Sequence, residues 1–445
     1  MGEKPGQLNS FVPPRPNRLL IGLMTPVNRW LMLKGMPLLR DVPVLNRVPG
    51  IRGIANVREI DFPDADRERL ETVCGKGKAT FLTPNHPEFF TDWMIDKEIV
   101  SKVAPLTASW ATNGVVNGLG RLAQRFWLAN NLIAQIPGSN DLARQHSVDW
   151  AVAGNGVLLH PEGAVGWHGD WVAPLMPGAA EMAVEALAKG RAAAPDFEAW
   201  LAPIVWKLVF LHDADAGLQA ECAYVEHKLG IAAPPVGATT AQRIHTIYQE
   251  LLFRDERKAG VTADRRGPVA VRLEGLAGIL SQRLAEAVEA SPDADVLRAA
   301  RRWLRDKGGT ASDEARGRVK QLAETLQRLK RLGPFAWADP AMTQEQAAEH
   351  IKRIRNDYCA GTLRDTLNRF VPQPVGPRRA IIRAPEPIPV HAFDGDAGAL
   401  TAELRRRLQA ALDGINTNLY REGVLRTYPN PFAYRAVAVT SSCRG

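Results

Sequence analysis

The chain of 445 residues has only four cysteines, Cys74, Cys222, Cys359 and Cys443, and they lie far apart in the sequence. This scarcity argues against a disulfide framework and against a zinc site built from paired cysteines, and it favours reduced thiols in a cytoplasmic protein. The sequence also lacks a repeated block and a glycine triplet period, which excludes solenoid and collagen-like folds. With 45% hydrophobic and 23% charged residues, the composition is that of an ordinary globular protein.

Long apolar runs are missing as well, since a membrane-spanning helix needs about 20 consecutive apolar residues. The most apolar stretch, from Arg18 to about Leu45, is interrupted by basic residues and prolines, and it predicts one or two short helices. No leader with a cleavage site precedes it, so we expect neither a membrane span nor a signal peptide. Two uses of this segment stay open: packing against the main domain, or lying in a lipid interface with its basic groups among the headgroups.

Positive charge exceeds negative charge, with 56 Lys and Arg against 48 Asp and Glu, a formal charge of +8. The excess is concentrated in residues 1–60 and 254–379. Such segments suit phosphates of lipid headgroups, a phosphorylated or acidic carrier, or nucleic acid. We expect no nucleic-acid partner, because no aromatic-rich RNA motif, zinc finger or helix-turn-helix accompanies the charge.

Residues 50–235 have an α/β pattern. Short apolar runs bounded by Gly, Pro or Asn predict buried strands at 79–82, 132–136, 156–159 and 204–211. Between the last two, helical spacing predicts a helix that begins after Gly178 and stops at Gly190.

Residues 240–372 are rich in Ala, Arg, Glu and Leu, and their apolar residues recur with helical periodicity. Their apolar stripe at 319–329 is flanked by basic residues, which is typical of a core-facing helix, with membrane contact as the minority interpretation. Prolines then mark a boundary at 372–377, a strand is predicted at 379–390 and an amphipathic helix at 400–415. We therefore predict a mainly helical insertion at 240–375 in an α/β domain of residues 49–239, with an N-terminal tail and apolar-basic segment at 1–48 and a closing strand, helix and C-terminal tail at 376–445.

A candidate general base follows the first of these strands, in the sequence TPNHPEFFTD at 83–92. Asp92 can accept a hydrogen bond from one imidazole nitrogen of His86 while the other nitrogen takes a proton from a hydroxyl. A structural His–Asp pair is the alternative interpretation. A second polar turn, GVLLHPEG at 156–163, would place Glu162 beside His86 if the two strands are neighbours.

The order NH-x5-D, PEG, PGAA-helix and APIV, at residues 85–205, resembles the glycerol-3-phosphate and 1-acylglycerol-3-phosphate (lysophosphatidate) acyltransferase family. The resemblance covers about residues 50–235 and returns weakly at 379–415. It implies a central mixed sheet flanked by helices. It also implies that His86 is the general base, that Asp92 orients it, and that Asn85, Pro161, Glu162 and Gly163 line the acceptor pocket.

Three departures from the family's pattern concern the His–Asp spacing and the residues that bind the acceptor phosphate. Five residues separate His86 from Asp92 where four are usual, and Asp96 is an alternative partner one turn later. The block after Gly163 lacks the family's Thr-Arg-Ser, and the segment at 136–140 lacks its Arg. Arg144 or Lys207 could hold an acceptor phosphate instead. A cluster of His160, Trp167, His168 and Trp171 stands where an Arg is expected, and its members either fill a turn or recognise the acceptor.

The expected activity is O-acyl transfer from an acyl thioester, acyl-CoA or acyl carrier protein, to a hydroxyl of a lysophospholipid or glycerol-phosphate-like acceptor, with no further cofactor and no metal. The absence of a Gly-x-Ser-x-Gly motif favours direct attack without an acyl-enzyme intermediate. The expected location is the cytoplasmic, inner face of an anionic membrane, as a peripheral protein. Two rivals stay open: a non-catalytic membrane-surface protein that retains the fold, and a metal hydrolase that uses His86, Asp92, His160, Glu162 and His168 as ligands.

Overall fold

The computed structural model describes residues 11–118, 120–136, 140–166, 168–232, 234–262, 267–291, 295–307, 309–332, 335–370 and 375–434. The chain forms two compact units, residues 1–214 with 366–425, and residues 215–365 with 426–445. These limits differ from the predicted domain boundaries, which lie between residues 239 and 240 and between residues 375 and 376. The difference arises because α9 (Asp215–Leu229) packs on α10 (Thr240–Lys258) and α15 (Gln344–Tyr358), and because Thr427–Pro429 pairs with Ala341–Thr343 in the second unit.

The first unit is built on a mixed sheet with the strand order β1-β8-β6-β2-β5-β3-β4, and β9 lies alongside β6. Strands β6, β2, β5, β3 and β4 are parallel, whereas β8 is antiparallel to β6. Because β2 and β5 are parallel neighbours, the polar turns that follow them meet at one edge of the sheet, as the two motifs require. The strands are β1 (Val57–Asp61), β2 (Lys78–Pro84), β3 (Ala108–Thr112), β4 (Leu132–Gln135), β5 (Gly156–Leu158), β6 (Glu198–Phe210), β8 (Arg378–Arg383) and β9 (Ile388–Pro389).

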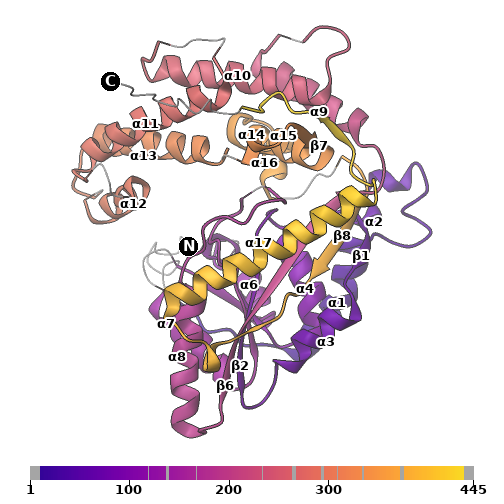
Figure 1. Ribbon diagram of the computed structural model, residues 1–445, viewed down its shortest axis with the longest axis vertical. Coiled ribbons are helices and arrows are strands. Elements are labelled where there is room, and N and C mark those ends of the chain that lie inside the picture. Colours follow the sequence, from indigo (N-terminus) through magenta and orange to yellow (C-terminus); the bar gives the residue numbers. More distant parts are fainter. Residues whose placement is uncertain are drawn as a thin grey trace, which may run out of the picture. The chain divides into compact units, whose positions relative to one another are not determined.

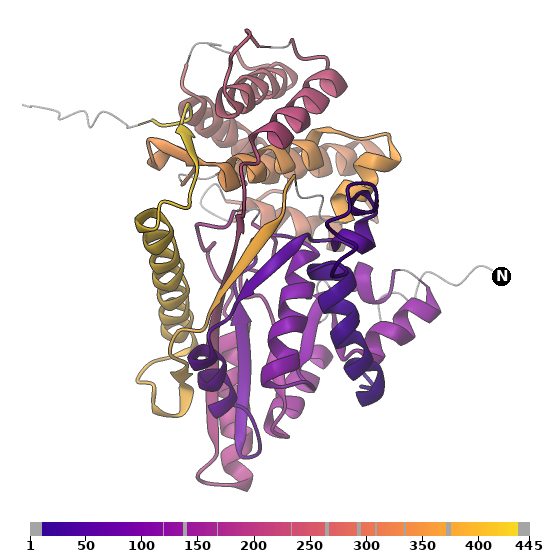
Figure 2. The same cartoon turned by 90° about the vertical axis from the view of Figure 1, so that its right-hand side faces the viewer.

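Helices cover both faces of this sheet (Figures 1 and 2), which confirms the expectation of an α/β unit with a mixed sheet flanked by helices. Side chains alternate along β2, so that Phe81 joins the core beneath α8 and α17 while Leu82 joins the core beneath α3 and α4. The helices are α1 (Arg18–Val27), α2 (Pro49–Arg52), α3 (Asp64–Thr72), α4 (Thr91–Val103), α5 (Asn113–Val116), α6 (Arg121–Ala129), α7 (Asp141–Val152), α8 (Gly178–Ala193) and α17 (Ala397–Arg421).

Three predicted elements have different limits. Helix α8 continues past Gly190 to Ala193, because Gly190 is a packing position: a Cβ there would lie 2.1 Å from the ring of Phe197. Strand β6 begins at Glu198, six residues before the predicted apolar run. The predicted strand at 379–390 is split into β8 and β9, since prolines at 385 and 387 cannot donate to a ladder.

The second unit is mainly helical, as predicted for most of this region. The apolar stripe of α13 (Asp313–Lys330) faces inward, with Val319, Leu326 and Leu329 buried, and α13 packs on α11. This confirms the core-facing interpretation of that helix. The other elements are α11 (Val269–Ala287), α12 (Val296–Asp306), α14 (Phe335–Ala338), the two-stranded sheet of β7 (Ala341–Thr343) and β10 (Thr427–Pro429), and α16 (Leu363–Phe370), which crosses the limit between the units.

The N-terminal apolar-basic segment forms α1 and a π-helical turn, η2 (Asn28–Leu33). One face packs against α4, where Asn28 donates a 2.8 Å hydrogen bond to the carbonyl of Met94. The opposite face leaves Leu19 87%, Leu23 63% and Trp30 40% exposed. Within the part of the chain that the structure describes, no helix combines the length and apolarity needed to cross a membrane.

Candidate active site

Asn85 fixes the turn that follows β2. Its side-chain Nδ2 donates to the carbonyl of Trp206 at 3.1 Å, and its Oδ1 accepts from the backbone N–H of Trp206 at 2.9 Å. The amide thus ties the end of β2 to the middle of β6 and sets the position of the next residue, His86. The side chain is committed to this bridge, and its expected contact with substrate stays a prediction.

His86 and Asp92 form the dyad that the motif predicts. The distance from His86 Nε2 to Asp92 Oδ2 is 2.7 Å, and both side chains are largely buried. Phe90, between the two residues, has a φ of 69° and leads the chain into the first turn of α4. Asp92 Oδ1 also accepts from the backbone N–H of Trp93 at 2.5 Å. The longer spacing therefore preserves the pair.

This arrangement sets the tautomer of His86. A carboxylate only accepts, so Nε2 carries the proton and Nδ1 carries the lone pair. Nδ1 is buried and has no hydrogen-bond partner among the described residues. Burial, and next the charge of His160, lower the pKa of His86 to about 4. Burial alone would raise the pKa of Asp92, but its bond to His86, the charges of both histidines and its bond to the Trp93 N–H together outweigh burial and hold the pKa below the usual value. His86 is accordingly a neutral base at pH 7, and Asp92 is charged.

A second His–Asp pair lies against the first. His160, after β5, has its Nε2 2.9 Å from Asp96 Oδ2 and its Nδ1 3.0 Å from the carbonyl oxygen of Asn85. The rings of His160 and His86 are stacked, with centroids 4.0 Å apart and planes 14° from parallel. Sequence reasoning missed this pair. The signal was present, because Asp92 and Asp96 are four residues apart and share one face of α4.

Glu162 holds the turn after β5 against the turn after β2. Its Oε1 accepts from the backbone N–H of His86 at 2.7 Å, and its Oε2 accepts from the N–H of Ala173 at 3.0 Å. Burial raises the pKa of Glu162, and the two backbone bonds oppose that shift. The carboxylate is therefore a positioning group for His86.

Pro161 and Gly163 shape the same turn. The Pro161 carbonyl accepts from the N–H of Met176 at 2.8 Å. Gly163 has a φ of +70°, and a Cβ at this position would lie 2.6 Å from Met176 Sδ. Both residues build the loop over the dyad, and their expected contacts with an acceptor stay predictions.

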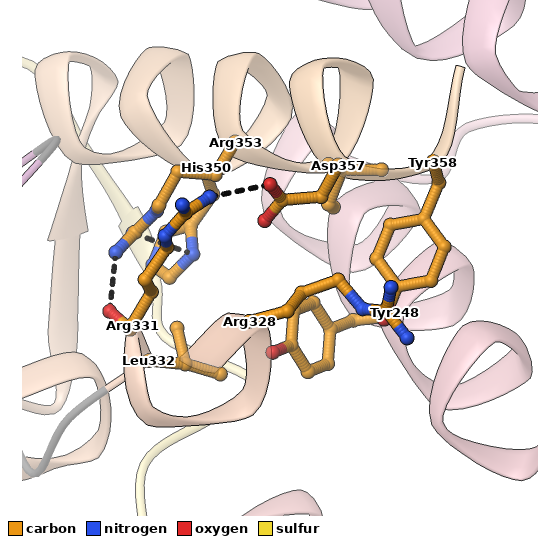
Figure 3. A pocket seen from close by; sticks show the side chains of 9 residues that line it. Tyr248, Arg328, Arg331, Leu332, His350, Arg353, Asp357 and Tyr358 are labelled. Carbon is orange, nitrogen blue, oxygen red and sulfur yellow. Dashed lines mark hydrogen bonds and ion pairs between the residues drawn. The ribbon is translucent and has the colours of Figure 1, made fainter. Parts of the chain in front are cut away.

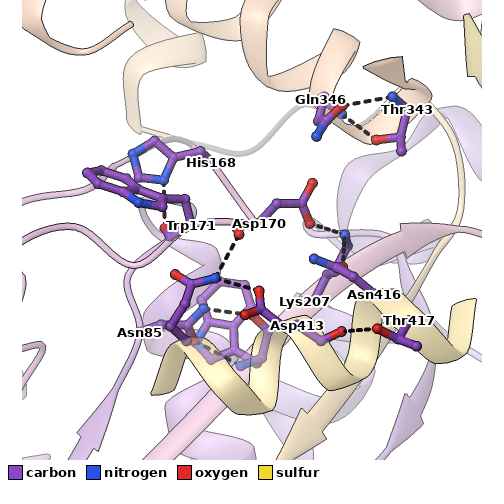
Figure 4. A network of polar contacts seen from close by, with 12 residues as sticks. Asn85, His168, Asp170, Trp171, Lys207, Thr343, Gln346, Asp413, Asn416 and Thr417 are labelled. Carbon is purple, nitrogen blue, oxygen red and sulfur yellow. Dashed lines mark hydrogen bonds and ion pairs between the residues drawn. The ribbon is translucent and has the colours of Figure 1, made fainter. Parts of the chain in front are cut away.

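The two basic residues proposed as substitutes for the missing Arg have partners inside the unit. Arg144 Nη1 lies 2.8 Å from Glu181 Oε2 of α8. Lys207 is 2% exposed and is bonded to Asp170, and its Nζ lies 2.6 Å from Asn416 Oδ1 (Figure 4). Both ammonium and guanidinium groups are thus engaged, so neither is poised to hold a phosphate in this structure.

Arg405 of α17 is a basic group that sequence reasoning did not select. Its guanidinium donates to the carbonyl of Val172 at 3.3 Å, and its charge lowers the pKa of Glu162, opposing burial. No carboxylate pairs with Arg405 in the part of the chain that the structure describes. Arg405 is thus a cation close enough to Glu162 to act on its charge.

The cluster at 167–171 lies partly outside the described residues, which omit Trp167. His168 is buried, its Nδ1 donates to the carbonyl of Trp171 at 2.9 Å, and its ring meets that of Trp171 edge-on (Figure 4). A Cβ on Gly166 would lie 2.5 Å from the His168 ring. These contacts agree with side chains that fill a turn.

His86, Asp92 and His160 offer ligand atoms within 4.8 Å of one another, so a metal site has to be weighed. A metal ion lies in the plane of each imidazole that binds it, whereas two stacked rings direct their lone pairs along separate, nearly parallel planes. Their nitrogens are also used: His86 Nε2 and both nitrogens of His160 already face acceptors. The geometry suits two hydrogen-bonded dyads better than a metal centre.

A groove of about 490 Å³ lies between α17 and the carboxyl end of β8, with Arg379 and Arg383 among its lining residues. β8 is antiparallel to β6, which is parallel to β2. Arg383 of β8 lies opposite Val205 of β6, whose neighbour Ile204 lies opposite Pro84 at the end of β2. The strand β6 thus separates the groove from β2, and neither His86 nor His160 lines the groove, so we assign it no part in chemistry at His86.

The second unit has a cavity bordered by arginines (Figure 3). Its volume of about 10 Å³ has room for one water molecule. Arg331 pairs with Asp357 at 2.5 Å, and Arg328 pairs with Asp255 at 3.0 Å. Arg353 donates to the carbonyl of Arg331 at 3.0 Å. Each of the three guanidinium groups thus has a hydrogen-bond partner within the helical unit, so we treat this cavity as a structural feature of that unit.

Comparison with family models and with curated proteins indicates no family for this chain. No protein-family model matches the chain, and no curated protein matches it significantly. The functional assignment therefore depends on the residues themselves.

Proposed function

We propose that this protein is an O-acyltransferase that moves a fatty acyl group from an acyl thioester to a hydroxyl of a lysophospholipid or polyol-phosphate acceptor. One observation carries the proposal: His86 is held by Asp92 in the tautomer that leaves Nδ1 as an unengaged proton acceptor. Catalytic bases need such a free nitrogen, and a purely structural histidine in a buried site ordinarily uses both nitrogens in hydrogen bonds.

The proposed reaction is a direct transfer. Nδ1 of His86 takes the proton from the acceptor hydroxyl, and the oxygen attacks the thioester carbonyl carbon. The C–S bond then breaks, the acyl group is left as an ester, and the departing thiolate receives the proton from Nδ1. Because Nδ1 is buried, acceptor binding has to open a path to it. Arg405 is our candidate for the acceptor phosphate, since Arg144 and Lys207 are engaged elsewhere.

Acyl transfer is tested with purified protein, acyl-CoA and acyl carrier protein donors, and lysophospholipid, glycerol phosphate and neutral acceptors. We expect transfer by the wild type and a loss of at least about 100-fold in His86→Gln. The matched control is His146→Gln on α7, which contacts Trp150 outside the dyads and is expected to retain activity. No transfer to any acceptor, or equal activity in His86→Gln, would refute the proposal.

A non-catalytic membrane-surface protein is the second candidate, and one observation favours its membrane part. Leu19, Leu23 and Trp30 form an exposed apolar face on α1 and η2, next to the basic Arg18. Such a face suits the interface of an anionic bilayer. If membrane binding is found without any acyl transfer, this second candidate replaces the first.

Vesicle flotation tests the membrane contact. We expect the wild type to float with anionic vesicles more than with neutral ones, and Leu19→Ser with Leu23→Ser to abolish flotation. Leu142→Ser on α7, at a position 60% exposed, is the matched control and should float as the wild type does. Binding that is equal in the double variant would show that this face is not the contact.

A further inference from the structure

The stacked pair at the candidate active site poses a charge problem. His86 and His160 follow two neighbouring parallel strands, and their rings are 4.0 Å apart. Each bonds to a carboxylate of α4, at 2.7 Å for Asp92 and 2.9 Å for Asp96. Two imidazolium rings at this distance in a buried site would repel each other strongly. The stack is therefore built to hold one positive charge and to resist a second.

While His86 is neutral, that single positive charge is on the ring of His160, which is paired with the carboxylate of Asp96. Both nitrogens of His160 face acceptors, the carbonyl oxygen of Asn85 and Oδ2 of Asp96. A neutral imidazole has one N–H and can satisfy only one of them. An additional proton must lie between Nε2 of His160 and Oδ2 of Asp96, since the backbone carbonyl cannot take it. Both side chains are less than 10% exposed, so the pair is largely shielded from bulk solvent.

We propose that His160 and Asp96 form a positioning pair that sets the proton affinity of His86 by sharing one positive charge with it. When Nδ1 of His86 gains a proton, the shared proton moves from Nε2 of His160 to Oδ2 of Asp96, where an O–H bond replaces the N–H bond. His160 then keeps its Nδ1–H bond to Asn85. The ring stack holds one positive charge before and after, and no electrons are exchanged.

The surrounding charges fit this account. From α4 come Asp92 and Asp96; from the loop after β5 comes Glu162, which bonds to the backbone of His86. On the loop that carries His86, Glu88 is neutralised by Arg378 of β8 at 2.6 Å. Arg405 of α17 acts on Glu162.

The pKa directions are consistent with one shared charge. Burial and then His160 lower the pKa of His86 to about 4. Burial alone would lower the pKa of His160, but the charge and hydrogen bond of Asp96, together with Asp92 and the Asn85 carbonyl, outweigh burial and raise the pKa to about 9. Burial raises the pKa of Asp96. A raised value on both members of this pair means that the pair retains its one shared proton.

The test is a histidine NMR titration of the whole chain labelled at Cε1, with the nine histidines assigned by single His→Gln variants. In the wild type, we expect the titration midpoint of His86 to lie below pH 5.5 and that of His160 to lie above pH 8. In His160→Gln, the midpoint of His86 should rise by one pH unit or more, a tenfold gain in proton affinity. Asp96→Asn should raise it similarly, because His160 then keeps a single N–H.

Asp96→Asn is nearly isosteric and decides the matter if His160→Gln does not fold. Asp149→Asn, which breaks an exposed ion pair with Lys189 on α7 and α8, is the matched control and should leave the titration unchanged. A His86 midpoint within 0.3 pH unit of the wild type in a folded Asp96→Asn protein overturns the inference.

The catalytic consequence rests on the proposed function, but the titration does not. If acyl transfer occurs, the acidic limb of its pH–rate profile should shift upward with the NMR midpoint in both variants. A shifted midpoint without any acyl transfer refutes the proposed function and leaves the charge sharing intact.

Discussion

Asp92→Asn separates a catalytic dyad from a merely structural one. Asp92 uses both oxygens, because Oδ2 accepts from His86 Nε2 at 2.7 Å and Oδ1 accepts from the N–H of Trp93 at 2.5 Å. Asparagine has one acceptor oxygen. If that oxygen keeps the bond to Trp93, the NH₂ group faces His86 and donates to Nε2. The imidazole proton must then move to Nδ1, which removes the base from the position where it is needed.

The expected cost follows from this tautomer change. A positioned general base contributes about 10² to 10⁴ in rate, and the same substitution in Ser-His-Asp hydrolases costs about 10⁴. We expect Asp92→Asn to lower kcat of acyl transfer about 10³-fold, equivalent to about 4 kcal/mol of activation free energy. The acceptor KM should change little, since the described hydrogen bonds of the Asp92 side chain reach only His86 and the backbone of Trp93.

Two measurements check the reasoning. Steady-state kinetics give kcat, and ¹⁵N chemical shifts of His86 report which nitrogen carries the proton. Asp149→Asn, which removes an exposed carboxylate from the same unit, should retain full activity. A variant that keeps kcat within about threefold of the wild type, or one in which Nε2 of His86 is still protonated while activity is lost, would refute the tautomer argument.

Three further predictions concern stability and pH. Glu256→Gln should lower the free energy of unfolding by about 3 kcal/mol or more in urea denaturation, because it leaves Arg272, only 6% exposed, without the charge it now bonds at 2.6 Å; a loss under 1 kcal/mol would contradict this. Gly163→Ala should cost about 1–2 kcal/mol, because its φ is +70° and its Cβ would meet Met176, and adding Met176→Ala should restore only the part due to the contact. His86 stays neutral in the folded chain down to about pH 4, whereas an unfolded histidine takes a proton near 6.5, so wild-type stability should fall by about 3 kcal/mol more than that of His86→Gln between pH 6.5 and 4. Equal slopes for the two proteins would count against a neutral His86.

The local signals in the sequence located several elements of the first unit. Apolar runs closed by Gly, Pro or Asn gave β2, β4 and β5 within one or two residues, because a buried strand needs such a run and such an end. Predictions failed where one residue type can serve two different structural roles. Gly190 looks like a helix stop but is a close-packing position against Phe197, and an amide such as Asn85 is polar in the sequence whether it binds a ligand or bridges two strands.

By itself, the sequence predicted that His86 pairs with Asp92, with Asp96 as the alternative partner, since a strand end and the first turn of the next helix are close whatever the rest of the fold does. It also placed a second polar turn at 160–163. Only the tertiary structure decided that β2 and β5 are neighbours, that the ring of His160 stacks on that of His86, and that Lys207 is engaged by Asp170. These contacts join residues 37 to 76 positions apart, whose distance is set by the packing of the whole sheet and its helices, and no local pattern encodes it.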